Sequence, residues 1–162
     1  MPEPLRPIQS SLTLAAAEKI IDAALAARRK EGLMPLVVAV LDSGGHLVAY
    51  KREDGSGLLR FDVAFGKAWG CLGMGMSTRL IRDRLAQRPA FQGALASVSD
   101  GRFIPVPGGV LVLDAAGNAI GAVGVSGDAS DKDEYCAIEG IRAAGLGSEP
   151  ADPQPEWRKA GL

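Results

Sequence analysis

His46 is the only histidine in the chain, and this limits the chemistry that an imidazole can perform here. A nucleophile–histidine triad has one candidate base, and a metal site built from several histidines is excluded. His46 follows the turn sequence Asp42-Ser-Gly-Gly45, so we expect it at the start of a strand. Axial ligation of a cofactor metal, proton transfer and an exposed hairpin position without a task are all compatible with this place.

Lys67 stands in Phe65-Gly-Lys-Ala68, on the side of a predicted helix that lies away from its apolar residues. A cation among glycines could bind a propionate or another carboxylate, and the alternative is a solvated lysine. Asp133 and Glu134 open the last predicted helix, where carboxylates stabilise the helix dipole. Lys67, Asp133 and Glu134 are also candidate catalytic acids or bases if burial tunes their pKa values.

Two glycine-containing segments flank the second predicted hairpin. They consist of Pro107, Gly108 and Gly109 before it, and of Ser126 and Gly127 after it. Backbone N–H groups in such segments can bind an anionic ligand. With His46 and Lys67, these residues form the predicted set for binding a ligand or cofactor, and no metal site is predicted.

The apolar pattern predicts the elements that must position these residues. Helices are expected near residues 14–30, 61–72, 78–87 and 130–144, a short helical turn after Pro89, and strands at 36–41, 46–51, 110–113 and 118–126. The order α-β-β-α-α-β-β-α predicts an α+β fold in which two hairpins form one antiparallel sheet flanked by helices. Gly66, Gly70 and Gly73 disfavour the second helix, so another backbone or a ligand should approach it closely.

Length and composition fit one globular domain and exclude several classes of protein. The 162 residues carry a net charge of −1, which gives no general attraction for nucleic acid or anionic lipid. The longest apolar run, Leu33–Leu41, is too short to span a membrane, and the lack of an apolar signal core favours the cytoplasm. We expect an extended arm over residues 1–11, the domain over 12–145 and a surface tail over 146–162.

A series of short motifs, in order along the chain, resembles the GlcG/HbpS family, which includes the C-terminal domain of PduO-type proteins. The motifs are Leu12-Thr-Leu-Ala-Ala-Ala17, Ala39-Val-Leu-Asp-Ser-Gly-Gly-His-Leu-Val48, Gly66-Lys-Ala68, Pro107-Gly-Gly-Val110, Gly121-Ala-Val-Gly-Val-Ser-Gly127 and Asp133-Glu134. This resemblance implies a profilin-like fold, assembly into dimers or larger rings and, in some members, bound haem. The chain departs from the PduO-like branch because its first predicted helix has no histidine to ligate haem.

Three functions remain open from the sequence. The first is a binding protein for a small ligand, either haem or another planar or carboxylate compound. The second is a cofactor-free isomerase, hydratase or hydrolase acting on a small catabolic intermediate. The third is an oligomeric scaffold or regulatory module. In each case we expect a homo-oligomer that binds neither nucleic acid nor a membrane.

Overall fold

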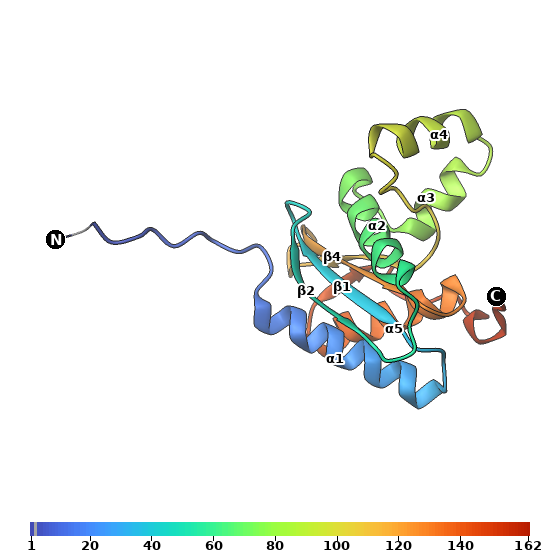
Figure 1. Cartoon of the computed structure of the whole chain (residues 1–162), viewed down its shortest axis with the longest axis horizontal. Coiled ribbons are helices and arrows are strands. Elements are labelled where there is room, and N and C mark those ends of the chain that lie inside the picture. Colours follow the sequence, from blue (N-terminus) through green and yellow to red (C-terminus); the bar gives the residue numbers. More distant parts are fainter. Residues whose placement is uncertain (2) are drawn as a thin grey trace.

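The computed structural model describes residue 1 and residues 3–162, and the fold is α+β (Figure 1). The elements are α1 (Leu14–Glu31), β1 (Val37–Asp42), β2 (Leu47–Arg52), α2 (Leu59–Met74), α3 (Thr78–Leu85), α4 (Pro89–Val98), β3 (Gly109–Leu113), β4 (Ala119–Ser126), α5 (Ser130–Ala143), β5 (Gly147–Glu149) and the 3₁₀-helix η1 (Trp157–Lys159). The predicted single antiparallel sheet with flanking helices is confirmed. Among the described residues, no helix is long and apolar enough to cross a lipid bilayer.

The sheet has five strands in the order β2-β1-β4-β3-β5, and every neighbouring pair is antiparallel. Helices α1 and α5 cover one face and α2 covers the other (Figure 1). Strand β1 is therefore buried on both sides: Val38 and Val40 join the core under α1 and α5, whereas Val37 and Ala39 pack toward α2. This explains why its sequence is continuously apolar instead of alternating.

The ends of the first helix follow from its flanking residues. The hydroxyl oxygen of Thr13 accepts a hydrogen bond from the backbone N–H of Ala16 at 3.2 Å. At the other end, Gly32 adopts a left-handed conformation with φ of 65°, which a glycine reaches without steric cost. Both boundaries agree with the prediction.

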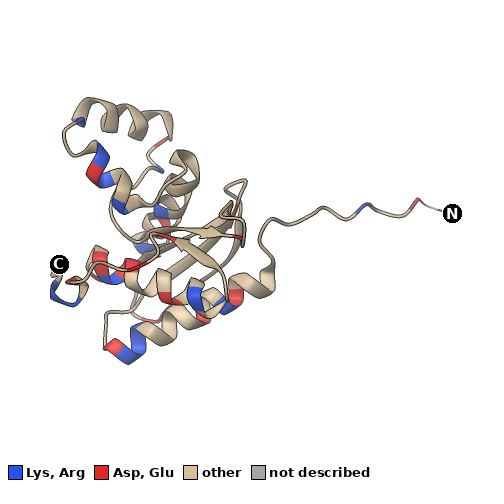
Figure 2. Ribbon diagram, turned by 180° about the vertical axis from the view of Figure 1, so that it is seen from behind, with Lys and Arg blue, Asp and Glu red and all other residues tan. Residues whose placement is uncertain are grey.

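Beyond α2 the chain leaves the sheet and builds a small helical lobe from α3 and α4 (Figure 1). Pro89 begins a ten-residue helix, where the sequence predicted only a short turn. Helix α4 buries none of its own residues completely, and it contains no charged side chain (Figure 2). An apolar helix that is so weakly covered is a surface available for contact.

The segment after residue 145 is more than the predicted surface tail. Strand β5 pairs with β3 and extends the sheet, and Trp157 is buried, with its ring stacked on Tyr135 at 3.8 Å between centroids. Neither contact was predictable from periodicity, because a three-residue strand and a single helical turn are too short to show any. By contrast, residues 3–11 are all exposed.

The glycines of α2 allow a close approach of backbone. A Cβ atom at Gly66 would lie 2.2 Å from the carbonyl oxygen of Arg102, and one at Gly70 would lie 3.3 Å from the ring of Phe103. On the neighbouring strand, a Cβ at Gly124 would lie 1.7 Å from the carbonyl oxygen of Ala64. The expected close contact is thus with the protein's own chain, whereas Gly73 has nothing within 4 Å of its Cβ position.

Two alanine substitutions in α2 should therefore have opposite effects on stability. We expect Gly66→Ala to lower the free energy of unfolding by about 1–3 kcal/mol, because the new methyl group overlaps a backbone carbonyl. Gly73→Ala should raise it by up to about 1 kcal/mol, since alanine favours the helix and the space is open. Urea unfolding followed by circular dichroism measures both, and equal effects of the two changes would contradict the close approach at Gly66.

Candidate functional site

Lys67 lies inside the protein and forms a buried ion pair with Asp133. The Lys67 side chain is 2 % exposed, and its Nζ donates to Asp133 Oδ2 at 2.9 Å and to the carbonyl oxygen of Val125 at 2.8 Å. The other oxygen of Asp133 accepts from the backbone N–H of Asp128 at 3.0 Å. Burial raises the pKa of Asp133, and the Lys67 ammonium opposes this rise. The alternative of a solvated lysine is wrong, because Lys67 lies against β4 and α5.

The two glycine-containing segments close around the Lys67 ammonium. A Cβ atom at Gly108 would lie 2.7 Å from Lys67 Nζ, and one at Gly109 would lie 2.5 Å from the Lys67 carbonyl oxygen. The N–H of Gly109 donates to Thr78 Oγ1 at 2.8 Å, so it is not free for an anion. Pro107, Ser126 and Gly127 are buried beside them. The predicted residues therefore meet in space, but they form a packed cluster instead of an open pocket.

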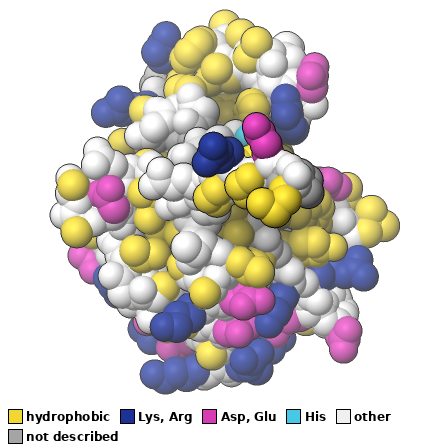
Figure 3. Space-filling model, turned by 90° about the vertical axis from the view of Figure 1, so that its left-hand side faces the viewer, with side chains coloured by type: hydrophobic (Ala, Val, Ile, Leu, Met, Phe, Trp, Pro, Cys, Tyr) yellow, Lys and Arg dark blue, Asp and Glu magenta, His cyan; other side chains and the backbone are white. Residues whose placement is uncertain are grey.

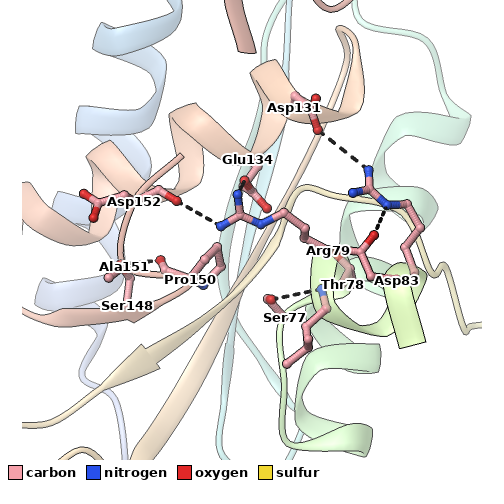
Figure 4. Close-up of polar contacts among 12 residues, drawn as sticks. Ser77, Thr78, Arg79, Asp83, Asp131, Glu134, Ser148, Pro150, Ala151 and Asp152 are labelled. Atoms are coloured by element: carbon pink, nitrogen blue, oxygen red, sulfur yellow. Dashed lines mark hydrogen bonds and ion pairs between the residues drawn. The ribbon is translucent and has the colours of Figure 1, made fainter. Parts of the chain in front are cut away.

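Glu134 is fully buried next to this cluster and has an unusual environment. Neither of its carboxylate oxygens has a hydrogen-bond partner within the described part of the chain. The nearest cation is Arg79, whose Nη1 is 3.4 Å from Glu134 Oε1 (Figure 4). Burial raises the pKa of Glu134 to about 7, and Arg79 only partly opposes this effect. Glu134 is thus no simple helix cap.

Arg79 connects the start of α3 to the segment that follows β5. Its Nη2 donates to the carbonyl oxygen of Asp152 at 2.9 Å (Figure 4). Nearby, the hydroxyl group of Ser77 donates to Glu149 Oε1 at 3.0 Å. The sequence pattern of α3 favours a solvated or subunit-contacting face for its arginines and does not reveal these contacts, which join segments more than 50 residues apart. The even spread of arginines around α3 gave no signal that one of them points inward.

His46 lies at the other end of the sheet from the Lys67 cluster. It follows the Asp42 end of β1, whereas Ser126 pairs with Val37 at the opposite end of that strand. The imidazole is 82 % exposed, and its Nδ1 is 3.4 Å from Asp42 Oδ1. The structure therefore separates the predicted ligand-binding set into two groups, with His46 alone on the surface.

Two adjoining hollows lie on the side of the molecule that carries His46, and the indole of Trp69 borders both of them. The turn hollow has a volume of about 190 Å³ and is lined by Ser43, Gly44, Gly45, Trp69, Leu72 and Gly73. The α2–α4 hollow has a volume of about 130 Å³ and is lined by Trp69, Gly70, Gly73, Met74, Leu95, Val98, Ser99 and Phe103. Figure 3 shows the histidine, in cyan, on this face of the molecule, partly hidden by side chains that lie in front of it in this view.

Arg102 adds a cation to this surface. Its guanidinium carbon is 4.4 Å from the centroid of the Trp69 ring, which is a cation–π distance. Neither Arg102 nor Trp69 was predicted to have a role. The position of Trp69 directly after Gly66-Lys-Ala68, in a chain with two tryptophans, could have indicated one. The described residues contain no group of three or more His, Cys, Asp or Glu that could hold a metal ion.

Comparison with known proteins agrees with this fold over most of the chain. The family described as "Haem degrading protein HbpS-like" matches residues 12–142. An uncharacterized 15.0 kDa protein from the dhaT-dhaS intergenic region of Citrobacter freundii is 30% identical over 128 residues, which are 79% of this chain and 88% of that protein.

Solved structures give the same result. The PduOC:heme complex has a TM-score of 0.76 and 25% identity, over 85% of this chain and 98% of that one. HbpS has a TM-score of 0.71 and 32% identity, over 85% of this chain and 92% of that one. The protein ORFY of Klebsiella pneumoniae has a TM-score of 0.75 and 27% identity, over 90% of this chain and 97% of that one. The chain therefore belongs to the HbpS-like family, as its motifs predicted.

Proposed function

We propose that this protein binds a small planar ligand that carries carboxylate groups, and that haem is the leading candidate. The observation that carries the proposal is the exposed imidazole of His46 next to Gly44, which lines the turn hollow together with the flat ring of Trp69. Imidazole is a common axial ligand of haem iron. The relatives named above include HbpS and a protein solved as a haem complex, which supports haem over other planar compounds.

Trp69 in the wall of the turn hollow, and Arg102 stacked on its ring, fit the chemistry of such a ligand. Trp69 offers an apolar face for stacking, and Arg102 would bind a carboxylate through charge-assisted hydrogen bonds. We assign this contact to Arg102 instead of Lys67, because Lys67 is buried and bonded to Asp133 and Val125. When bound, haem would supply the electron-transfer or oxygen chemistry of its iron.

The size of the turn hollow limits how the ligand would be held. Its volume of about 190 Å³ is below the roughly 300–1,000 Å³ of ordinary ligand pockets. A hollow of this size would enclose only part of a porphyrin. The enzyme alternative is less well supported, because Lys67, Asp133 and Glu134 are at most 2 % exposed and no substrate reaches them in this arrangement.

An absorbance titration with hemin tests the proposal. We expect a saturable shift of the Soret band near one equivalent per chain, and we expect His46→Ala to abolish it because the axial nitrogen is lost. Tyr50→Phe is the matched control. It removes a phenolic oxygen, which could also ligate iron, from an exposed residue of the same hairpin. A shift that persists in His46→Ala would contradict ligation by His46, and the absence of any shift in the parent protein would contradict haem.

A further inference from the structure

We propose that the α2–α4 hollow is a docking site for the N-terminal arm of a second copy of this chain. The ligand proposed above uses the adjoining turn hollow, so this inference does not depend on it. Within the described part of the chain, the arm and the outer face of α4 are apolar surfaces that remain exposed.

The arm exposes large aliphatic side chains completely. Leu5 is 96% exposed and Ile8 is 95% exposed, although residues of this type normally bury most of their surface in folded proteins. The arm is anchored at its C-terminal end. The hydroxyl oxygen of Ser11 accepts a hydrogen bond from the N–H of Ser43 at 2.9 Å, and the next residue, Leu12, is packed in the core. From this anchor the arm points away from its own domain (Figure 1). It is therefore presented to another molecule.

The spacing of residues in the arm matches a polyproline II helix. This helix repeats every three residues, so Leu5 and Ile8 would project from the same face, and Pro4 and Pro7 from another. Proline also stiffens the arm in an extended form, which disfavours folding back onto its own root. Segments of this kind commonly dock in grooves lined by aromatic side chains.

The α2–α4 hollow has the complementary properties. Trp69 and Phe103 contribute aromatic walls, and Met74 and Leu95 contribute flexible apolar ones. Its volume of about 130 Å³ is too small for an ordinary ligand but suits one aliphatic side chain. Val98 stands at its rim with 79% exposure, so the lobe is uncovered in the single chain.

Size-exclusion chromatography with light scattering, at several micromolar concentrations, tests the interaction in the full chain. We expect the parent protein to form an oligomer, and we expect Leu5→Ser/Ile8→Ser to have a lower molar mass, with fewer copies in each particle. The matched control is Arg6→Ser/Gln9→Ser, which has the same spacing on other faces of the arm and should behave as the parent. Retention of the parent's size by Leu5→Ser/Ile8→Ser would overturn the proposal.

A mixing experiment separates exchange between copies from folding back within one copy. Val98→Arg blocks the hollow at an exposed position, and deletion of residues 1–10 removes the arm. Each variant alone should form a smaller assembly than the parent. The mixture should associate, because Val98→Arg supplies the arm and the chain without residues 1–10 supplies the hollow. Failure of the mixture to associate would overturn docking between copies.

Fluorescence of Trp69, read in a Trp157→Phe background, reports on the hollow itself. We expect a synthetic peptide of residues 1–11 to shift this emission to the blue, with saturation, when added to the arm-less chain. The Val98→Arg form of that chain should not respond. If the blue-shifted emission is present in full-length protein that remains monomeric, the arm docks within its own chain and the proposal is wrong.

Discussion

Replacement of Lys67 by methionine is expected to lower the free energy of unfolding by about 3–5 kcal/mol, because it removes one partner of a buried ion pair. Asp133, which is 1 % exposed, would keep only the hydrogen bond from the Asp128 N–H. The Val125 carbonyl oxygen would also lose its contact with the ammonium group. Urea unfolding at neutral pH, followed by circular dichroism, measures the loss.

A second variant separates the lost ion pair from a general packing defect. Lys67→Met/Asp133→Leu removes both charges and so leaves no buried charge without a partner, and such replacements are often neutral or stabilising. We therefore expect the double variant to recover most of the stability lost by Lys67→Met. If the two variants are equally unstable, the loss of stability comes from the changed packing of the side chains and not from the broken ion pair.

Glu134→Gln is expected to change the pH dependence of stability. The pKa of Glu134 is raised to about 7 from an ordinary value of 4.5, so the native protein holds a proton that the unfolded chain releases. This group therefore stabilises the fold fully below about pH 4.5, and its contribution is lost as the pH rises through about 7. The interval between the two pKa values corresponds to a change of at most about 3 kcal/mol in the free energy of unfolding.

The difference in unfolding free energy between Glu134→Gln and the parent, measured across this pH range, isolates the effect of Glu134. The variant should match the parent at the acidic end and become more stable than it above neutrality, because glutamine carries no charge to desolvate. Glu139→Gln on the same helix is the control, since Glu139 is partly exposed and pairs with Arg142 at the surface. A constant difference at every pH would show that Glu134 has an ordinary pKa.

The elements of the fold were predictable where local signals are strong. The two hairpins have apolar strands joined by the turns Asp42–Gly45 and Asp114–Gly117, and both form as expected. The tight contacts of α2 were indicated by its glycines, because only a close neighbour justifies their cost in a helix. Strand β5 is held by pairing with β3 and has no pattern of its own to reveal it.

The candidate site was only partly predictable, since its geometry depends on residues far apart in the chain. Lys67 was singled out correctly, but its burial depends on Asp133 and Val125, which approach it through α5 and β4. A helical pattern shows which side of α2 is apolar. It does not show that β4 and α5 place a carbonyl oxygen and a carboxylate against Lys67. The distance between His46 and the Lys67 cluster follows from strand register, which no single-residue pattern reveals.

The outer edge of β2 has a consequence for how copies of this protein can meet. Strand β2 ends the sheet, and among the described residues no strand pairs with its far side. Lys51 and Arg52 sit on this edge and both are exposed, and Lys51 Nζ pairs with Asp22 Oδ1 at 2.6 Å. Charged side chains at a free edge oppose sheet-to-sheet growth between molecules, which would otherwise continue without limit. This edge is thus protected against open-ended aggregation, and contacts between copies are favoured at other surfaces.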